Sequence, residues 1–224
     1  MADEQLARLE RIVEHAADLR SLLIRPTRPF AFQPGQFVSC LLAVDDSRLT
    51  RPYSIASAPE HPEELELLLN LVPNGPGSAH LFSLAPGADL TLTGPWGKFD
   101  LERQPAAETV FVADGTGIAP IRPMLARAVT TGRHAITLLH AAPPGTRHVY
   151  ADEHVALAAR TDRLDVALLA SDDLEQVVVS RYVHADTDRT RHFFICGVGD
   201  TVVRLRQLLR EAGYDRRAVR YEKW

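Results

Sequence analysis

The stretch Arg51-Pro52-Tyr53-Ser54-Ile55-Ala56-Ser57 decides how the first half of this chain is interpreted. Its aromatic and β-branched residues predict a short strand, and Pro52 restricts that strand to a sheet edge or an opening. Because side chains alternate along a strand, Arg51, Tyr53 and Ile55 share one face. An arginine beside a tyrosine offers an anion clamp next to a flat ring, and Ser54 adds a hydroxyl. A phosphate-bearing aromatic cofactor needs such a set, whereas the alternative is a strand whose polar residues simply face water.

Composition narrows the class of protein. The chain has 224 residues and a net charge of −4, which suits one or two domains and indicates neither nucleic acid nor an anionic membrane as a partner. Cys40 and Cys196 lie far apart, which excludes a zinc ribbon or a cysteine-ligated iron–sulfur cluster and fits a reducing cytoplasm. No apolar run is long enough to span a bilayer, and the nine histidines form no metal-ligand pair. We therefore expect a cytoplasmic protein without a metal.

Short apolar segments separated by glycine and proline dominate the first half. They predict strands over residues 37–42, 51–57, 65–72 and 90–92, with turns at Pro34-Gly35, Asp45-Asp46-Ser47, Pro86-Gly87 and Gly94-Pro95-Trp96-Gly97. Ser78 is well placed to cap a short helix over residues 79–84. Residues 2–24 allow either one amphipathic helix or two strands, 9–15 and 19–24; local pattern favours the helix, and the resemblance described below favours strands, which we expect. The pattern is typical of a small antiparallel barrel.

The second half alternates strands with helices. After a polar linker over residues 101–108, strands are predicted at 110–113, 135–139, 164–169, 192–196 and 218–221, with helices at 118–129, 150–159 and 201–212. Such alternation predicts a parallel sheet with helices on both faces and ligands beyond the carboxyl ends of the strands. We expect two domains, residues 1–103 and 104–224.

Three segments lie at those carboxyl ends. Asp114-Gly115-Thr116-Gly117-Ile118-Ala119-Pro120 has the spacing G-x-G-x-x-P and no acid after the second strand, so the usual dinucleotide-binding fingerprint fails. Its two glycines and helix start can still receive a diphosphate, and the alternative is a glycine-rich turn of unknown use. Cys196-Gly197 ends the fourth strand, and Tyr221-Glu222-Lys223-Trp224 are the last residues. Taken alone, the cysteine is a small core residue and the tryptophan a packing anchor.

The ordered set of motifs resembles the ferredoxin–NADP reductase superfamily from about residue 34 onward. The residues that carry the resemblance are Pro34-Gly35-Gln36-Phe37, Arg51-Pro52-Tyr53-Ser54, Gly75-Pro76-Gly77-Ser78, Gly94-Pro95-Trp96-Gly97, Gly115-Thr116-Gly117-Ile118-Ala119-Pro120, Cys196-Gly197 and Glu222-Lys223-Trp224. The resemblance implies an all-β antiparallel barrel that binds FAD, followed by an α/β parallel-sheet domain that binds NADH or NADPH. Electrons would pass from the nicotinamide to the flavin.

The resemblance implies flavin contacts from Arg51, Pro52, Tyr53, Ser54, Leu71, Val72, Gly77 and Ser78. Arg51 would pair with the diphosphate, together with the helix start at Gly77 and Ser78. Tyr53 would pack against the isoalloxazine and ribityl chain, and Leu71 and Val72 would offer backbone groups to the ring edge. Ser54 would hydrogen-bond near N5, which requires a local twist or bulge because alternation places it opposite Tyr53.

The nucleotide contacts that the resemblance implies are Gly115, Thr116, Gly117, Ser171, Asp172, Cys196, Gly197 and Trp224. Ser54, Cys196, Glu222 and Trp224 would form the reaction site, where Trp224 covers the flavin and moves aside for the nicotinamide. Family members that use NADP tend to carry an arginine where Asp172 stands, so we lean to NADH, although Arg147 and Arg181 could still supply a phosphate clamp. Asp114 departs from the family pattern, because a carboxylate near a diphosphate is unfavourable unless it points away.

The electron acceptor is the open question. A chain of this length leaves no room for a fused ferredoxin-like or globin domain, so we expect a separate acceptor, a ferredoxin or an oxygenase component. Alternatives are a reductase of free flavin, a non-catalytic electron-transfer subunit of a larger complex, and a degenerate nucleotide-binding module without a redox role.

Overall fold

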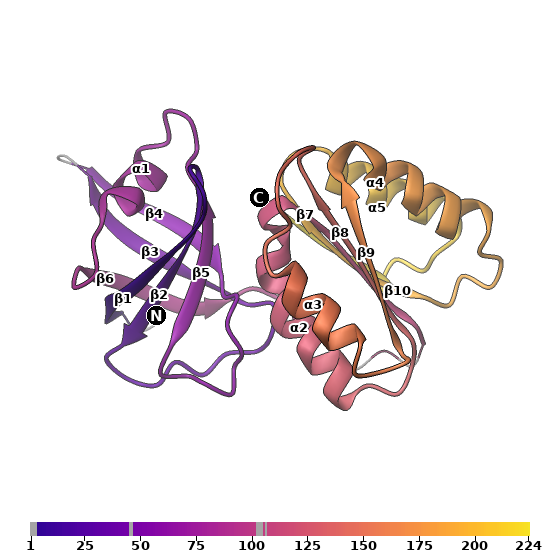
Figure 1. Cartoon of the computed structure of the whole chain (residues 1–224), viewed down its shortest axis with the longest axis horizontal. Coiled ribbons are helices and arrows are strands. Elements are labelled where there is room, and N and C mark those ends of the chain that lie inside the picture. The colour runs from indigo at the N-terminus through magenta and orange to yellow at the C-terminus, as the bar shows by residue number, and fades with distance from the viewer. Residues whose placement is uncertain (1–3, 45–46, 102–104, 106) are drawn as a thin grey trace. The chain divides into compact units, whose positions relative to one another are not determined.

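The computed structural model describes residues 4–44, 47–101, 105 and 107–224, and it divides into two compact units (Figure 1). Unit 1 is Met1–Asp100 and unit 2 is Leu101–Trp224. The domain boundary that we predict between residues 103 and 104 falls outside the described residues. The same holds for Asp45 and Asp46 of the predicted turn and for part of the predicted linker.

Unit 1 is an antiparallel sheet of six strands in the order β4-β3-β6-β1-β2-β5. The strands are β1 (Gln5–Ala16), β2 (Leu19–Pro26), β3 (Phe37–Val44), β4 (Ser47–Ser54), β5 (Leu65–Asn70) and β6 (Asp89–Trp96). Pro52 lies in β4 at the sheet edge, as its missing N–H requires. The two edge strands approach at one bridge, Ile55 to Leu67, beside a hydrogen bond of 2.8 Å from the Ala56 amide to the Glu66 carbonyl. The sheet therefore curls around its core, and the predicted antiparallel flavin-domain fold is confirmed.

Residues 5–26 form two strands, β1 and β2, so the helical alternative is wrong. β1 pairs with β2 from Ala7–Pro26 to Ala16–Leu19 and with β6 at its other edge. Leu9, Leu22 and Ile24 are completely buried in the core of unit 1. Pairing on both edges of β1 outweighs the helical spacing of its apolar residues, which local pattern alone cannot reveal.

Two local predictions in unit 1 are wrong. The segment Gly94-Pro95-Trp96 continues β6 instead of turning, because Trp96 pairs with Phe37 of β3. The short helix α1 spans Pro76–Ser83 with Gly75 at its N-cap, so Ser78 lies inside the first turn and is not the cap. Pro76 explains the shift, since proline is favoured at the first helical position and pulls the helix start forward.

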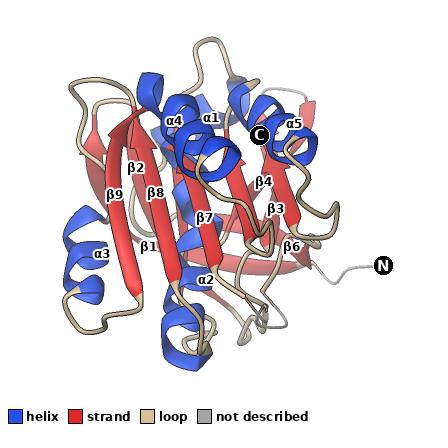
Figure 2. Ribbon diagram, turned by 90° about the vertical axis from the view of Figure 1, so that its right-hand side faces the viewer, coloured by secondary structure: helices blue, strands red, loops and turns tan. Residues whose placement is uncertain are grey.

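Unit 2 is a parallel sheet of five strands in the order β11-β10-β7-β8-β9. The strands are β7 (Thr109–Asp114), β8 (Ile136–Ala142), β9 (Leu164–Ala170), β10 (His192–Gly197) and β11 (Val219–Lys223), and β7, β8 and β9 lie side by side in Figure 2. The chain runs outward from β7 to β9 and then returns to β10 on the other side of β7. The order therefore reverses between β7 and β10, where α/β sheets bind ligands.

Helices cover both faces of the parallel sheet, which confirms the predicted fold class. Figure 1 shows α2 (Ile118–Thr131) and α3 (Ala151–Ala158) on one face and α4 (Ser171–Val178) and α5 (Thr201–Glu211) on the other. Leu174 of α4 and Leu205 of α5 are completely buried against the sheet. Helix α4 is absent from the helices predicted in unit 2. The start signal was present, because acidic residues fill the first turn after Ser171.

In the part of the chain that the structure describes, no helix is both long enough and apolar enough to cross a membrane.

Candidate functional site

In unit 1, the side chain of Arg51 lies over the start of α1. A Cβ atom on Gly77 would come within 2.9 Å of Arg51 Cγ and 3.2 Å of its Nε. Only a residue without a side chain permits this approach. The arginine and the helix start, far apart in sequence, therefore form one feature, which we call the anion cradle (Arg51, Gly77 and Ser78).

The first turn of α1 gives the cradle open donors. Pro76 has no N–H, and the amides of Gly77 and Ser78 come too early in the helix to find an intrahelical acceptor. The Ser78 hydroxyl is already engaged, because it accepts from the Val72 amide at 3.0 Å and donates to the Gly75 carbonyl at 3.0 Å. Backbone amides and the Arg51 guanidinium are thus what this site offers to an anion.

Leu71 and Val72 follow β5 and are exposed. The Leu71 amide donates to the Asp18 carbonyl at 2.7 Å, and the Val72 amide donates to Ser78. Of the backbone groups that we expected at a flavin ring edge, the two N–H groups are therefore used within unit 1. Carbonyl oxygens and apolar side chains remain available at this position.

Tyr53 and Ser54 lie at the end of β4. Tyr53 packs on the core of unit 1, and burial raises the pKa of its phenol to about 12. Ser54 is buried, and its Oγ has no hydrogen-bond partner among the described residues. The β3–β4 register runs without a shift from Val44–Ser47 to Phe37–Ser54, so of the predicted twist or bulge at Ser54, the bulge is absent from this pairing. The hydroxyl therefore sits on the opposite face from Tyr53.

In unit 2, the glycine-rich loop leaves β7 at the point where the strand order reverses. Gly115, Thr116 and Gly117 form one 3₁₀ turn that leads directly into α2. Gly115 has a φ of +57°, a left-handed conformation that favours glycine, and a Cβ there would meet nothing within 4 Å. The turn thus presents backbone beside open space, which fits a ligand that must come close to the main chain.

Gly117 is required for a different reason. A Cβ at this position would lie 2.1 Å from the Cys196 carbonyl oxygen and 2.7 Å from the Gly197 nitrogen. A Cβ atom on Gly197 would in turn lie 2.9 Å from the Cβ atom of Asp114. The loops after β7 and β10 therefore touch backbone to backbone, and we call this pair of loops the switch-point loops (residues 114–117 and 196–197).

Cys196 and Glu222 are partners in the β10–β11 register, so their side chains leave the sheet on the same face. Burial, with the nearby Glu222 carboxylate, raises the pKa of the Cys196 thiol well above its usual range. Burial also raises the pKa of Glu222 to about 7, and its Oε1 has no partner in the described part of the chain. The pair is an uncharged thiol beside a carboxyl group that titrates near neutral pH.

Trp224 contacts the end of β10 at Cys196 and Gly197. Its backbone amide donates to the Gly197 carbonyl at 3.1 Å, and its side chain makes a hydrogen bond that lowers the pKa of Cys196 against the effect of burial. The structure therefore brings together three of the four residues predicted for the reaction site, all in unit 2. Ser54 belongs to unit 1, and its meeting with them stays a prediction.

Asp114 points away from the glycine turn. Its Oδ1 accepts a hydrogen bond of 2.6 Å from the Ser171 hydroxyl at the start of α4. The carboxylate is thus directed to the start of α4 and not to the turn of Gly115, Thr116 and Gly117, which is the condition that a carboxylate near a diphosphate must meet. It also engages the only proton of the Ser171 hydroxyl, while Asp172 beside it remains exposed.

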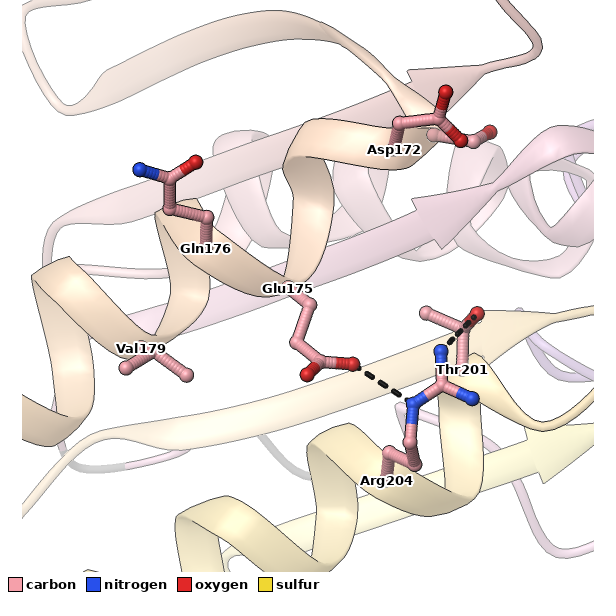
Figure 3. Close-up of a pocket in the computed structure, with 7 residues that line it drawn as sticks. Asp172, Glu175, Gln176, Val179, Thr201 and Arg204 are labelled. Carbon is pink, nitrogen blue, oxygen red and sulfur yellow. Dashed lines mark hydrogen bonds and ion pairs between the residues drawn. The ribbon is translucent and has the colours of Figure 1, made fainter.

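A cavity of about 640 Å³ opens between the first turns of α4 and α5. Its lining residues are Ser171, Asp172, Glu175, Gln176, Val179, Thr201 and Arg204, and we call it the α4–α5 pocket. Figure 3 shows the Glu175 carboxylate directed at Arg204, whose Nε donates to Glu175 Oε2 at 2.8 Å. Of these lining residues, only Ser171 and Asp172 were predicted from the sequence, because α4 was not. The signal for this helix was an acidic first turn followed by apolar residues four positions apart, Leu174 and Val178.

Arg181 does not supply a phosphate clamp at Ser171. It pairs with Asp165 at 3.3 Å, near the start of β9, whereas Ser171 follows the end of that strand. Six residues of strand separate the two ends by about 20 Å. Arg147 pairs with the exposed Asp152, so each of the two arginines that we considered already has a carboxylate partner.

Three histidines gather beside β8. The ring centroid of His140 lies 5.1 Å from that of His148 and 5.8 Å from that of His154. Burial lowers the pKa of His140 to about 3 and that of His154 to about 4, so both rings are neutral core residues. No group of histidine, cysteine or acidic residues suited to a metal ion occurs among the residues with described positions.

Comparison with known families divides the chain in the same way. Residues 4–101 match the oxidoreductase FAD-binding domain, and residues 111–203 match the oxidoreductase NAD-binding domain. The first match contains the anion cradle. The second contains the glycine turn, Ser171, Asp172 and Cys196.

Individual relatives agree. Ferredoxin–NADP reductase B of Sorangium cellulosum is 34% identical over 212 residues, covering 88% of this chain and 87% of the relative. The ferredoxin–NAD(P)⁺ reductase component of naphthalene 1,2-dioxygenase/salicylate 5-hydroxylase systems from a Ralstonia species is 31% identical and covers 71% of this chain. This chain spans 48% of that relative's length. Among solved structures, a ferredoxin NADP⁺ reductase from Neisseria gonorrhoeae with bound FAD and NADP has a TM-score of 0.85 at 22% identity, covering 100% of this chain and 99% of that one.

Proposed function

Because this chain belongs to the ferredoxin–NADP reductase family, we propose that it carries electrons from NADH through FAD to a separate protein, a ferredoxin or an oxygenase component. That it is an NAD(P)H-dependent flavoprotein oxidoreductase follows from family membership. The choice of nucleotide, the acceptor and the residue roles are the content of the proposal.

The anion cradle is the observation that carries the proposal. Arg51 and the first-turn amides of α1 converge on one point of unit 1, which is what a flavin dinucleotide's diphosphate needs. The missing Cβ of Gly77 lets Arg51 lie across the helix start. A diphosphate also distinguishes FAD from FMN, whose single phosphate would leave one side of the cradle unused. Tyr53, packed at the edge of the core, offers a ring for an apolar cofactor surface.

When bound, FAD supplies the redox chemistry by taking two electrons from the nicotinamide and passing them on. The chain's own residues position and shield. The switch-point loops hold the main chain of Gly115, Thr116 and Gly117 open to the dinucleotide. Cys196 gives the nicotinamide an uncharged wall, because its thiol stays protonated. Glu222 can hold a proton at its carboxyl group near neutral pH.

NADH is favoured by the residues at the start of α4. The Ser171 hydroxyl already donates its proton to Asp114, so it cannot donate to a 2′-phosphate. Asp172 would repel that phosphate and could accept a hydrogen bond from a ribose hydroxyl. Arg181, the alternative cation, lies at the far end of β9.

A protein acceptor is supported by the names of the relatives. They include the reductase component of naphthalene 1,2-dioxygenase/salicylate 5-hydroxylase systems and the glycine betaine monooxygenase reductase subunit of Pseudomonas aeruginosa. This chain spans 48% and 61% of the lengths of those two relatives, so the acceptor remains part of the proposal. Free flavin and an electron-transfer subunit without catalytic turnover are the alternatives that the experiment must separate.

The test is anaerobic stopped-flow reduction of the FAD-loaded protein. We expect NADH to bleach the flavin absorbance faster than NADPH, and a ferredoxin or oxygenase component to reoxidise the reduced protein faster than free FMN does. A protein that binds no FAD overturns the proposal. Faster reoxidation by free flavin than by any protein acceptor replaces it with the free-flavin alternative.

Trp224 is proposed to cover the flavin and to move aside for the nicotinamide. Trp224→Ala removes a ring that must otherwise be displaced, so we expect a lower KM for the nucleotide in steady-state reduction. Trp96→Ala, at the only other tryptophan in the sequence, is the control. An unchanged KM for both nucleotides in Trp224→Ala contradicts the gating role.

A further inference from the structure

The α4–α5 pocket contains a cation that the proposed function does not use. Arg204 projects from the first turn of α5, and its side chain is 56% exposed. Its Nε donates to Glu175 at 2.8 Å, and its Nη2 donates to the Thr201 hydroxyl at 3.3 Å. The Glu175 carboxylate raises the pKa of Arg204, so the guanidinium is charged whenever the pocket is occupied.

The pocket lies where the adenosine half of a dinucleotide must go. The strand order places β10 and β11 on one side of the switch point and β8 and β9 on the other. The side of β10 and β11 carries Cys196, Glu222 and Trp224. With the nicotinamide on that side, the adenosine half of the dinucleotide extends towards the end of β9. Ser171 and Asp172, which follow β9, line the pocket. The three strand-to-strand spacings from β10 to β9 add up to about 14 Å, a distance that one dinucleotide can span.

The charges in this pocket oppose a second phosphate. Asp172 and Glu175 contribute two carboxylates and Arg204 one guanidinium, so the lining is negative overall. A 2′-phosphate carries nearly two negative charges. It would meet Asp172 directly, and it would have to compete with Glu175 for the guanidinium. Figure 3 shows that the carboxylate of Glu175 points to Arg204 and away from Asp172.

From this geometry we infer that Glu175 is a specificity-determining residue, which selects against NADPH by occupying the guanidinium of Arg204. The inference rests on the proposed function, since it assigns the α4–α5 pocket to the adenosine half of the nucleotide. It adds that discrimination depends on the Glu175–Arg204 ion pair as well as on Asp172. Releasing Arg204 would give the 2′-phosphate a charge-assisted partner without any new residue.

The first experiment compares reduction of the FAD-loaded protein by both nucleotides. Glu175→Gln is close in shape and removes the charge, and an exposed ion pair contributes little to stability, so the variant should fold. We expect the ratio of kcat/KM for NADPH to that for NADH to rise about tenfold. In the double variant E175Q/R204Q the ratio should return to the starting value, because the gain depends on the freed guanidinium.

Asp165→Asn is the matched control. It breaks a second exposed arginine–carboxylate pair, with Arg181 at 3.3 Å, and changes the net charge by the same amount at the other end of β9. We expect the ratio to stay within twofold of the original. A tenfold change in this control would assign the effect to net charge and overturn the inference. So would an unchanged ratio in E175Q, or a gain that persists in E175Q/R204Q.

The second experiment separates this inference from the proposed function. Calorimetric titration with 2′,5′-ADP and with 5′-AMP probes the pocket without any redox step. We expect E175Q to bind 2′,5′-ADP about tenfold tighter than the original protein and to bind 5′-AMP with less than a twofold difference. If neither NADH nor NADPH reduces the flavin, the proposed function fails whatever the titrations give. If NADH reduces it and E175Q binds 2′,5′-ADP no tighter, only the role of Glu175 fails.

Discussion

The anion cradle of unit 1 and the switch-point loops of unit 2 both depend on a glycine, but the glycines face different neighbours. The missing Cβ of Gly77 would meet the side chain of Arg51, which can withdraw. That of Gly117 would meet the carbonyl of Cys196, which is fixed in a strand paired on both sides. The cradle should therefore tolerate changes of shape and be sensitive to charge. The switch-point loops should be sensitive to shape and indifferent to charge.

The largest effect that separates the two regions is expected from Gly117→Ala. The added methyl group would lie 2.1 Å from a backbone oxygen, so strands β7 and β10 or the turn itself must move. We expect a loss of about 3 kcal/mol or more in the free energy of unfolding, measured by urea denaturation.

Gly115→Ala, two residues away, is the control. It meets nothing within 4 Å and carries only the cost of a left-handed φ of +57°, about 1 kcal/mol. Equal losses in the two variants would show that conformation and not close approach governs this turn, and the comparison between the two regions would collapse.

These glycines also show what sequence could and could not reveal. The G-x-G-x-x-P spacing predicted a turn that exposes backbone, and the structure contains it. The sequence could not predict that Gly115 is required for its backbone conformation and Gly117 for close approach, because Gly117 meets Cys196 only after β10 pairs with β7. The same limit applies to Arg51 and Gly77, whose residue types were predicted as one site but whose contact depends on the fold.

Local rules failed where a neighbouring residue or strand overrode them. Ser78 looked like a helix cap, but Pro76 moved the start of α1 to Gly75. Gly94 and Pro95 predicted a turn, but pairing with β3 extends β6 through them. The α4–α5 pocket was missed almost entirely, since Arg204 and Glu175 lie on two helices that become neighbours only when both pack on the same face of the sheet.

The charge sensitivity of the cradle is tested by Arg51→Ala. Loss of a guanidinium that faces a diphosphate should weaken FAD binding by about 2–3 kcal/mol, roughly 30- to 150-fold in Kd. The free energy of unfolding of the FAD-free protein should change little, because among the described residues the Arg51 side chain donates only to its neighbour's carbonyl, Thr50 O, at 2.9 Å. Fluorescence titration of the FAD-free protein with FAD measures the first quantity.

Arg48→Ala removes an arginine from the same strand and is the matched control. Its register partner is Ala43, three pairs away from that of Arg51. We expect its FAD affinity to stay within about twofold of the original. Equal weakening by both substitutions would reduce the cradle to general electrostatic attraction.

Glu222 lies outside the switch-point loops, on β11 opposite Cys196, and there we expect unit 2 to be sensitive to charge. Its pKa in the folded protein, about 7, lies above its usual value of 4.5 because the carboxyl group is buried. Burial therefore favours the protonated form of Glu222. The contribution of this form to the stability of the folded protein is fully present below pH 4.5 and is lost as the pH rises through 7. Glu222→Gln is neutral at every pH, so it should gain stability relative to the original protein by about 2 kcal/mol between pH 5 and pH 9, after allowance for partial exposure.

Calorimetric unfolding of both proteins across this pH range measures the difference. A constant difference between pH 5 and pH 9 would mean that Glu222 is solvated in the folded protein. Glu211→Gln, on the exposed end of α5, gives the baseline for a carboxylate that makes only a surface contact with Gln207.

The smallest expected effect concerns how the cradle is held in place. The Ser78 hydroxyl accepts from the Val72 amide at 3.0 Å and donates to the Gly75 carbonyl at 3.0 Å, so it ties the loop before α1 to the helix. Ser78→Ala leaves the Val72 amide without this acceptor, and we expect a loss of about 1 kcal/mol in the free energy of unfolding.

Ser83→Ala is the control. It removes a hydroxyl from the same helix that, among the described residues, donates only to the His80 carbonyl, at 2.8 Å in an exposed position, so its cost should stay within about 0.5 kcal/mol. If FAD affinity falls in Ser78→Ala and not in Ser83→Ala, then the loop's position matters to the cradle as well as its charge. Equal behaviour of the two variants would leave Arg51 as the sole determinant, because a tether whose removal changes nothing cannot be orienting the amides of Gly77 and Ser78.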